Sequence, residues 1–363
     1  MYKKTWFKIH LYLGFTAGIV LFIIGITGAI LAFQTEILNV VNKKSLIVEV
    51  RDTQKLTVTE IISSFKQGFP KAKINSITFS KAKNSSVIIN IIGKKGRAKR
   101  RGINYYINPY TSEILPSFKG RGFFKFVENI HRRLAMGKFG AQIVAVSTLM
   151  LFILMFSGVY LYWKKIKKSF VKSMTINFKA KKRPFLASLH SVIGMWVIPI
   201  YLVSSITGLY WSYDWFNKGL YCIAGVEKPI RMKKKMNQNH NTKETSIKEI
   251  QNTVNVFNKN VKEYKRANLR LNVKNDIYTI TYLDNNSIHD RARNSIKIDN
   301  KTNEIINRNK FSNKPLLEKL LSSNYALHTG EYFGITGKII MFIGGLCMIL
   351  FFVTGIMMYL KRR

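Results

Sequence analysis

The sequence predicts an α-helical membrane protein with four transmembrane helices in two parallel repeats, each carrying a small extracytoplasmic α+β domain. Three observations lead to this fold class. Four apolar windows are each long enough to cross a bilayer. Positive charge gathers at both chain ends and in the one short loop between windows. Matched residues recur in the two halves of the chain.

The apolar windows distinguish this 363-residue chain from a soluble protein. A transmembrane helix needs about 20 predominantly apolar residues. The windows run over residues 11–33, 139–163, 186–210 and 339–360. The first is too long for the apolar core of a secretory signal, and no A-x-A cleavage site follows it. We therefore expect it to be retained as the first transmembrane helix.

The orientation follows from the charge beside the windows. The loop between the second and third windows contains no acidic residue and many basic ones, which are Lys164, Lys165, Lys167, Lys168, Lys172, Lys179, Lys181, Lys182 and Arg183. Both chain ends are also basic. Because cytoplasmic loops are enriched in Lys and Arg, we expect this loop and both termini in the cytoplasm. The two long segments then face the periplasm of a bacterial inner membrane.

These assignments divide the chain at stated boundaries. They are transmembrane helix one at 1–35, a first outer domain at 36–130, helix two at 131–165, a basic cytoplasmic loop at 166–184, helix three at 185–213, a second outer domain at 214–327, and helix four with a basic tail at 328–363. Period-two alternation and turn residues predict a helix and then strands in both outer domains. The helices are expected at 58–65 and 247–257, and the strands at 74–79, 86–92, 103–107, 268–273, 278–282 and 295–298.

The two halves of the chain share matched residues in register. In the first and third windows the pairs are His10 with His190, Gly14 with Gly194, Thr27 with Thr207, and Gly28 with Gly208. Around the second and fourth windows they are His131 with His328, Gly137 with Gly334, Gly140 with Gly337, Ser157 with Thr354, and Gly158 with Gly355. Both halves begin on the same side of the membrane, so the predicted repeat is parallel rather than inverted.

Four of the six histidines occupy these matched positions. His10 and His190 lie at the predicted cytoplasmic ends of their helices, and His131 and His328 lie just before the outer ends of theirs. Ionisable residues near a membrane are costly and mark functional sites by default. We expect each pair to meet between the halves, where two imidazoles are able to hold one haem iron axially. The alternative is that the rings lie at the interface and hydrogen-bond to lipid headgroups.

The remaining polar and small residues support this hypothesis less directly. His240 and His289 lie in polar stretches and read as residues of solvated loops. The matched glycines are expected to leave room for a flat macrocycle or, alternatively, to allow close helix packing; they are Gly14, Gly194, Gly28 and Gly208. The basic neighbours are expected to contact haem propionates or lipid headgroups; they are Arg132, Arg133, Lys138 and Lys338 outside and Lys8 and Arg183 inside.

His131 precedes its apolar window by about eight residues, which corresponds to ~12 Å of helix. A continuous helix would therefore carry its ring well away from the membrane interface. We expect a break near Gly137 and Gly140 that brings the ring back.

With these residues the chain resembles the PepSY-associated transmembrane helix family, whose members are often called iron-regulated membrane proteins. The resemblance covers essentially the whole chain. It rests on Trp6-x3-His10-x3-Gly14 with Gly25-x-Thr27-Gly28, on His190-x3-Gly194 with Thr207-Gly208, on His131 and His328, and on the closure Asn108-Pro109…Thr111-x-Glu113 of the first outer segment, which resembles the end of a PepSY domain. The second outer segment departs from that pattern, because its closure, Asp299-Asn300-Lys301-Thr302, lacks the proline.

The resemblance implies an inner-membrane protein linked to iron uptake, with PepSY-like outer domains. Some members resemble two-haem ferric-siderophore reductases, so it implies that His10, His190, His131 and His328 are axial ligands of two haems b. The implied partners are the lipid bilayer, a ferric siderophore, and a quinol or flavoprotein electron donor. The resemblance leaves open whether the chain is itself the reductase enzyme. No side chain here supplies a nucleophile or general base, so the chemistry would be the cofactor's.

The net charge of +41 also raises other function classes. Nucleic acid is not expected as a partner, because the basic residues are spread along the chain and no nucleic-acid motif accompanies them. Anionic lipid headgroups are the simpler partner. A transporter is disfavoured, because no acidic residue lies at the centre of any window. The main alternative to electron transfer is a membrane-anchored PepSY-domain protein that binds or regulates a peptidase or another envelope protein.

Overall fold

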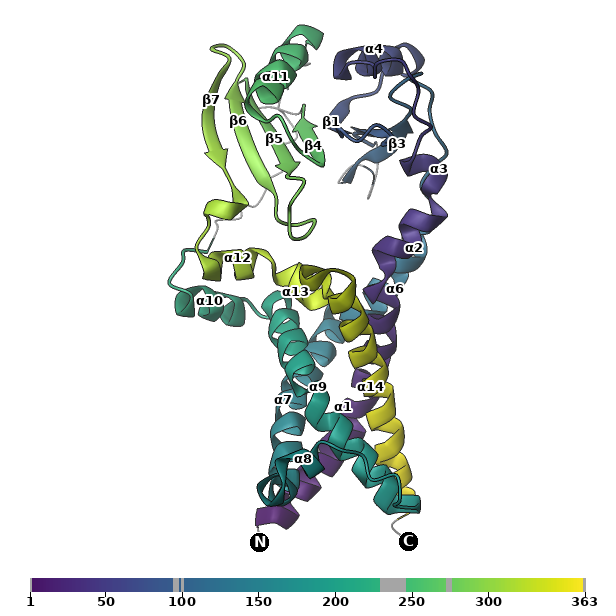
Figure 1. Ribbon diagram of the computed structural model, residues 1–363, viewed down its shortest axis with the longest axis vertical. Helices are drawn as coiled ribbons and strands as arrows, with labels where there is room; N and C mark the ends of the chain where they lie inside the picture. Colours follow the sequence, from purple (N-terminus) through teal and green to yellow (C-terminus); the bar gives the residue numbers. More distant parts are fainter. Residues whose placement is uncertain (1, 94–97, 99–100, 229–245, 272–275, 362–363) are drawn as a thin grey trace. The chain divides into compact units, whose positions relative to one another are not determined.

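The computed structural model describes residues 2–93, 98, 101–228, 246–271 and 276–361. The chain forms two compact units (Figure 1). One comprises Met1–Thr35, Arg121–Lys228 and Leu320–Arg363 and is helical; the other comprises Glu36–Gly120 and Pro229–Lys319 and contains a β-sheet. Each unit draws on both halves of the sequence.

The helical unit is built around four long helices, α1 (Tyr2–Ala32), α7 (Gly137–Lys168), α9 (Lys182–Ser212) and α14 (Gly334–Leu360). Among the described residues these are the helices long and apolar enough to cross a membrane. The prediction of four membrane-spanning helices is therefore confirmed. Helix α1 packs against α7 and α14, and α9 packs against the same two, so the four form a bundle. The start of α1, the end of α14 and the short helix α8 (Phe170–Ser173) lie at the same end of it (Figure 1).

Small residues allow the helices of this bundle to approach closely. A Cβ atom added to Gly25 would lie 2.7 Å from the carbonyl oxygen of Gly345, and the reverse distance is also 2.7 Å. The backbones of α1 and α14 are therefore in contact, which is how membrane helices gain packing energy without a hydrophobic driving force between them. On the other side of α14, the buried Tyr201 hydroxyl donates to the carbonyl oxygen of Gly344 at 2.9 Å.

The expected break before the second membrane helix is confirmed. Helix α6 (Arg121–Arg133) carries His131 and ends three residues before α7 begins. The connection has left-handed backbone at Leu134, Ala135 and Gly137, with φ of 48°, 58° and 62°. The chain thus turns between the two helices instead of continuing the segment that was predicted as one helix over 131–165. The corresponding place near the C-terminus has the short helix α13 (Asn324–Thr329), which carries His328, then η2 (Glu331–Phe333) and α14.

The second unit contains one seven-stranded antiparallel sheet in the order β3-β2-β1-β4-β5-β6-β7. The strands are β1 (Ile74–Phe79), β2 (Val87–Ile91), β3 (Ile103–Ile107), β4 (Arg266–Arg270), β5 (Ile277–Leu283), β6 (Asn294–Asp299) and β7 (Glu304–Asn309). The accompanying helices are α2 (Gln34–Val41), α3 (Lys43–Leu46), α4 (Val58–Gly68), α11 (Ile247–Asn260) and η1 (Phe311–Asn313). Within the described residues, two further helices are α10 (Asp214–Ile223) and α12 (Leu316–Ser322).

The two outer segments, expected as separate domains, share this sheet. Strand β1 of the first pairs with β4 of the second from Ser76 opposite Arg270 to Phe79 opposite Ala267. The pairing removes one exposed edge from each set of strands, and exposed edges invite aggregation. Helices α4 and α11 contact each other, and their apolar faces join the strands in one buried core around Phe257.

The local rules used for prediction account for most elements of this unit. Both helices begin with a capping box, formed by Thr57 with Glu60 in α4 and by Ser246 with Glu249 in α11. The expected strands are present to within a few residues, and β7 extends beyond the predicted set.

The closing turns of the two outer segments are built alike despite the missing proline. The side chain of Asn108 accepts from the Tyr110 backbone N–H at 2.9 Å, and the side chain of Asp299 accepts from the Lys301 backbone N–H at 2.8 Å. Each is an Asx-type turn, which any residue with a standard φ in the second position is able to complete. Asn300 in place of proline therefore leaves the turn unchanged.

The expectation for His289 was wrong. The side chain is buried, with a residue exposure of 5%, rather than solvated. Its Nδ1 accepts from the backbone N–H of Arg291 at 3.1 Å, and its ring packs against Phe311 with ring centres 5.7 Å apart. The polar sequence around it hid this burial, because the apolar partner lies more than 20 residues later. His240 lies outside the described residues.

Candidate functional site

The four matched histidines meet in two pairs within the helical unit. His10 of α1 faces His190 of α9, with ring centres 6.3 Å apart and ring planes at 73°. His131 of α6 faces His328 of α13, with ring centres 6.2 Å apart and ring planes at 66°. Each pair therefore takes one imidazole from each half of the chain, and the two pairs have nearly the same geometry.

A side-chain hydroxyl holds one nitrogen of every ring. The Nδ1 atoms lie within hydrogen-bond distance of a buried Ser or Thr Oγ: 2.8 Å for His10 and Ser157, 2.8 Å for His190 and Thr354, 3.0 Å for His131 and Thr27, and 2.9 Å for His328 and Thr207. The other ring nitrogen, Nε2, is therefore the one available to bind a ligand.

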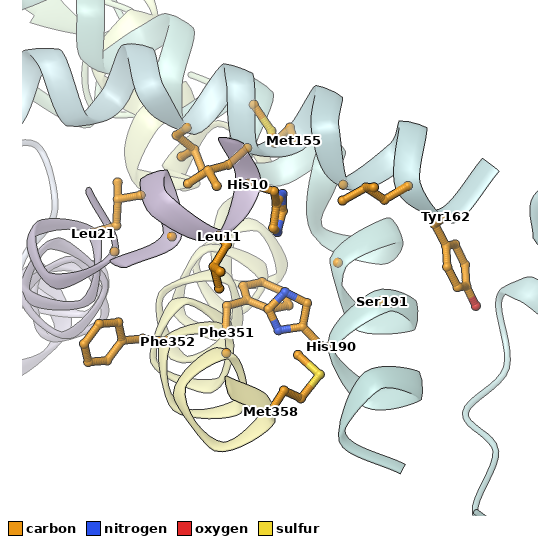
Figure 2. Close-up of a pocket in the computed structure, with 18 of the residues that line it drawn as sticks. His10, Leu11, Leu21, Met155, Tyr162, His190, Ser191, Phe351, Phe352 and Met358 are labelled. Carbon is orange, nitrogen blue, oxygen red and sulfur yellow. The ribbon is translucent and has the colours of Figure 1, made fainter. Parts of the chain in front are cut away.

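His10 and His190 project into a partly open cavity of about 460 Å³ that is lined by residues of the four long helices (Figure 2). This volume lies within the range of pockets that bind small molecules and cofactors. The lining is mostly apolar and aromatic, and Phe351 lies against the His190 ring with ring centres 5.1 Å apart. The cavity therefore offers two imidazoles in a predominantly apolar space.

Glycines make much of the room around the rings. Those lining the cavity are Gly14, Gly18, Gly158, Gly194 and Gly355. A Cβ added at Gly14 would meet no atom within 4 Å, so it would project into open space. At the other pair, a Cβ on Gly28 would lie 3.2 Å from Cε1 of His131, and one on Gly208 would lie 3.6 Å from Cε1 of His328. All four predicted site glycines thus border the cavity or a ring: Gly14 and Gly194 line the cavity, and Gly28 and Gly208 lie beside the rings of the second pair.

The second pair is partly buried. Helices α6 and α13 carry these two rings, and the Trp211 indole stands edge-on to His328 with ring centres 5.3 Å apart. Desolvation lowers the pKa of both His131 and His328 below the ordinary histidine value. Both imidazoles are therefore neutral at pH 7, which is the protonation state required of a metal ligand.

The basic residues predicted to lie near the histidine pairs differ in what they contact. Arg183 lines the cavity, together with Lys3, which had not been singled out, whereas Lys8 is not among the lining residues. Arg132 forms an ion pair with Glu128 at 3.3 Å on the exposed side of α6. Lys338 is buried at the start of α14. Arg183 and Lys3 are thus the cations placed to meet an anionic group at the His10 pair.

Each histidine pair offers two side chains as ligands for a metal ion. In the described part of the chain no group of three or more His, Cys, Asp or Glu side chains is placed to hold a metal ion. Two opposed imidazoles are one of the ligand sets that hold a haem iron, since the macrocycle supplies the other four nitrogens. The facing rings, the apolar cavity and the glycine lining all fit that group.

Comparison with known families agrees with the resemblance noted in the sequence. A family model described as the PepSY-associated TM region matches residues 7–362. The chain belongs to the PepSY-associated TM region family. It is accordingly a multi-pass membrane protein of this class, with four membrane helices and a separate antiparallel sheet region that fits a PepSY-like domain. A search of curated proteins found no match.

Sequence reasoning did not assign the hydroxyl partners in this PepSY-associated protein. Thr27, Thr207, Ser157 and Thr354 were recognised only as matched positions. A signal for their role was present, because each is followed directly by glycine. In addition, Thr27 follows His10 by 17 residues and Thr207 follows His190 by 17. A hydroxyl-glycine pair repeated four times beside four histidines is an unusual pattern for simple helix packing.

Proposed function

We propose that this PepSY-associated membrane protein is a dihaem electron-transfer protein that reduces a ferric chelate, such as a ferric siderophore, on the outer face of the bacterial inner membrane. The observation that carries the proposal is the pair of facing imidazoles found twice in the bundle. Two haems b are the proposed cofactors, with His10 and His190 holding one and His131 and His328 the other.

The spacing of the rings supports axial ligation. A metal ion bound by an imidazole nitrogen on each side at ~2 Å, together with the distance from nitrogen to ring centre, separates the ring centres by ~6 Å. The observed separations are 6.3 Å and 6.2 Å. The separations of the ring centres are therefore compatible with one metal ion held between the two rings of each pair.

The separation of the two pairs supports a path across the bilayer. His10 lies 17 residues from Thr27, whose hydroxyl contacts His131, and both residues belong to the continuous helix α1. At 1.5 Å per residue this is ~25 Å of helix. The hydrocarbon core of a membrane is about 30 Å thick. One pair thus lies towards each end of the bundle.

The chain's own residues would bind the cofactor, orient it and exclude water. A haem supplies one-electron chemistry between ferric and ferrous iron. A buried cluster of Ala17, Leu21, Leu151 and Val197 with Tyr201 packs in the bundle and supplies apolar lining next to the His10 pair. Arg183 and Lys3 would pair with carboxylates at the His10 site.

The topology belongs to the same proposal. We place both termini and the basic segment 166–184 in the cytoplasm by the positive-inside rule, and the sheet unit in the periplasm. The matched His–hydroxyl contacts support the two parallel repeats inferred from the sequence. The electron donor would be a quinol or a flavoprotein at the cytoplasmic side. The basic outer segments would attract anionic ferric chelates at the outer side.

The test is a dithionite-reduced minus air-oxidised absorbance spectrum of the purified, detergent-solubilised protein, with haem counted per chain. We expect sharp b-type bands and about two haems per chain, the number of axial histidine pairs. His10→Ala and His328→Ala should each remove one haem, while His240→Ala, an unmatched histidine, should remove none. A chain that stays colourless after haem supplementation would reject the proposal and favour a membrane-anchored PepSY-domain protein that binds an envelope partner without redox activity.

A further inference from the structure

In each of the four histidines, Nδ1 lies within hydrogen-bond distance of a hydroxyl group on a membrane helix. We propose that Thr27, Ser157, Thr207 and Thr354 are positioning residues, which fix each imidazole as the Nδ1–H tautomer and direct its Nε2 lone pair at the haem iron. The inference rests on the proposed function and deepens it, because it names the groups that orient the ligands.

The position of each hydroxyl proton follows from a second contact. Each Oγ lies very close to the backbone carbonyl oxygen four residues earlier in its own helix: 2.7 Å for Thr27 to Ile23, 2.7 Å for Ser157 to Ile153, 2.5 Å for Thr207 to Val203, and 2.7 Å for Thr354 to Leu350. A carbonyl oxygen carries no proton, and two bare oxygens at this distance would repel. The single hydroxyl proton must therefore point at the carbonyl.

The tautomer of each histidine then follows by exclusion. A hydroxyl that has donated its only proton is able only to accept, so the Nδ1 atom at 2.8–3.0 Å must carry the proton. A neutral imidazole with a proton on Nδ1 has its lone pair on Nε2. The same hydrogen-bond chain, from Nδ1–H to hydroxyl to helix carbonyl, recurs at all four rings and sets the same ligand atom each time.

Burial makes these bonds effective. The four hydroxyl residues have exposures of 0% for Ser157, 4% for Thr354, 5% for Thr207 and 6% for Thr27. Bulk water has little access to compete for Nδ1, so a ring that lost its hydroxyl would lose a buried hydrogen-bond partner. Loss of the hydroxyl should therefore leave the imidazole ring less well oriented.

The residue after each hydroxyl completes the arrangement. At three of the four sites, a Cβ on the following glycine would lie 3.2–3.6 Å from Cε1 of the same histidine, as with Gly28 and His131. One turn of helix thus provides both the hydrogen-bond acceptor and the space for the ring edge. The position is Ser once and Thr three times, so the hydroxyl rather than the methyl group is the common requirement.

The experiment compares full-length variants that keep the shape but remove the acceptor. Thr27→Val and Thr207→Val act on one pair, and Ser157→Ala and Thr354→Val on the other, while Thr27→Ser and Ser157→Thr retain a hydroxyl. The matched control is Thr148→Val, because the Thr148 hydroxyl donates to the Val144 carbonyl oxygen at 2.8 Å and has no histidine partner among the described residues. The readouts are the rate of haem loss to excess apomyoglobin, the g-values in electron paramagnetic resonance, and the midpoint potential of each haem.

We expect the Val and Ala variants to lose haem from the affected pair about 10–100-fold faster, because outer-shell partners of ligating histidines contribute on that scale. The midpoint potential of that haem should rise, since an imidazole without its acceptor is a weaker base, and its g-values should change. The Ser and Thr exchanges and Thr148→Val should behave as the wild type. If wild type holds two haems and the Val variants match it in all three readouts, the positioning role is overturned while the proposed function stands. If wild type holds no haem, both fail.

Discussion

Replacement of Gly28 by alanine tests the geometry of the His131 site with the smallest change available. The added Cβ would lie 3.2 Å from Cε1 and 3.7 Å from Nδ1 of His131. Carbon atoms in contact prefer separations of about 3.5–4.0 Å. The ring must therefore move by ~0.3–0.8 Å, while its Nδ1 is tied to Thr27 at 3.0 Å.

The magnitude follows from the cost of overpacking. Inserting a methylene into a well-packed site costs about 1–3 kcal/mol. With 1.4 kcal/mol per tenfold change, haem at the His131 pair should bind ~5–150-fold more weakly. The matched change Gly208→Ala should be nearly neutral, because its Cβ would lie at 3.6 Å from Cε1 of His328, an ordinary contact. Gly122→Ala, on the exposed face of α6 with nothing within 4 Å, controls for helix propensity.

The assay is haem transfer to excess apomyoglobin, followed by absorbance, with a count of the haem left per chain. Gly28→Ala should retain the haem of the His10 pair and release the other early. Equal behaviour of Gly28→Ala, Gly208→Ala and wild type would refute the reasoning, because it would mean that the edge of the His131 ring does not limit the site. Loss of both haems from Gly28→Ala would also refute it, because the predicted effect is confined to one pair.

Three further predictions concern the rest of the molecule. Leu269→Ala, at a fully buried position of β4, should destabilise the sheet unit by about 2–5 kcal/mol, seen as faster amide hydrogen exchange in β1 and β4, whereas Ile306→Ala at an exposed position should have little effect. Hydrogen bonds from the Thr57 backbone and hydroxyl lower the pKa of Glu60, so their contribution to stability is present at neutral pH and is lost as pH falls below the ordinary carboxyl range; Glu60→Gln should flatten that part of the pH–stability curve. If the segment after α9 faces the periplasm, the exposed thiol of Cys222 should react with a membrane-impermeant maleimide in intact spheroplasts. Cys222→Ser should abolish that label. A label that appears only after lysis would reverse the proposed orientation.

Local patterns predicted the elements better than their partners. The four membrane helices follow from length and hydropathy, and the strands of the sheet follow from alternation, so both could be placed within a few residues. The pairing of β1 with β4 could not be predicted, because it joins segments almost 200 residues apart and nothing in either strand specifies its neighbour. The burial of His289 against Phe311 was missed for a similar reason.

The candidate site was also predicted in part. Register between the halves singled out the four histidines, and position in the bundle paired them in the same way as the structure. The hydroxyl contacts were not predicted, although each hydroxyl residue is followed by glycine, because a Ser or Thr within an apolar helix usually bonds to its own backbone. The helix geometry that brings Thr27 beside His131 depends on the turn at Leu134 and Ala135, where positive φ in non-glycine residues is hard to anticipate.

The histidine–hydroxyl and histidine–histidine contacts are distributed differently between the two halves of the chain. Every histidine–hydroxyl contact lies within one half: His10 with Ser157 and His131 with Thr27 in the N-terminal half, and the two equivalent contacts in the C-terminal half. Every histidine–histidine contact, by contrast, joins the halves. Each half therefore orients its own two imidazoles but supplies only one ring to each pair. Under the proposed function, neither half alone would hold a haem between two histidines, and the packing of α1 against α14 and of α7 against α9 is what brings the halves of the bundle together.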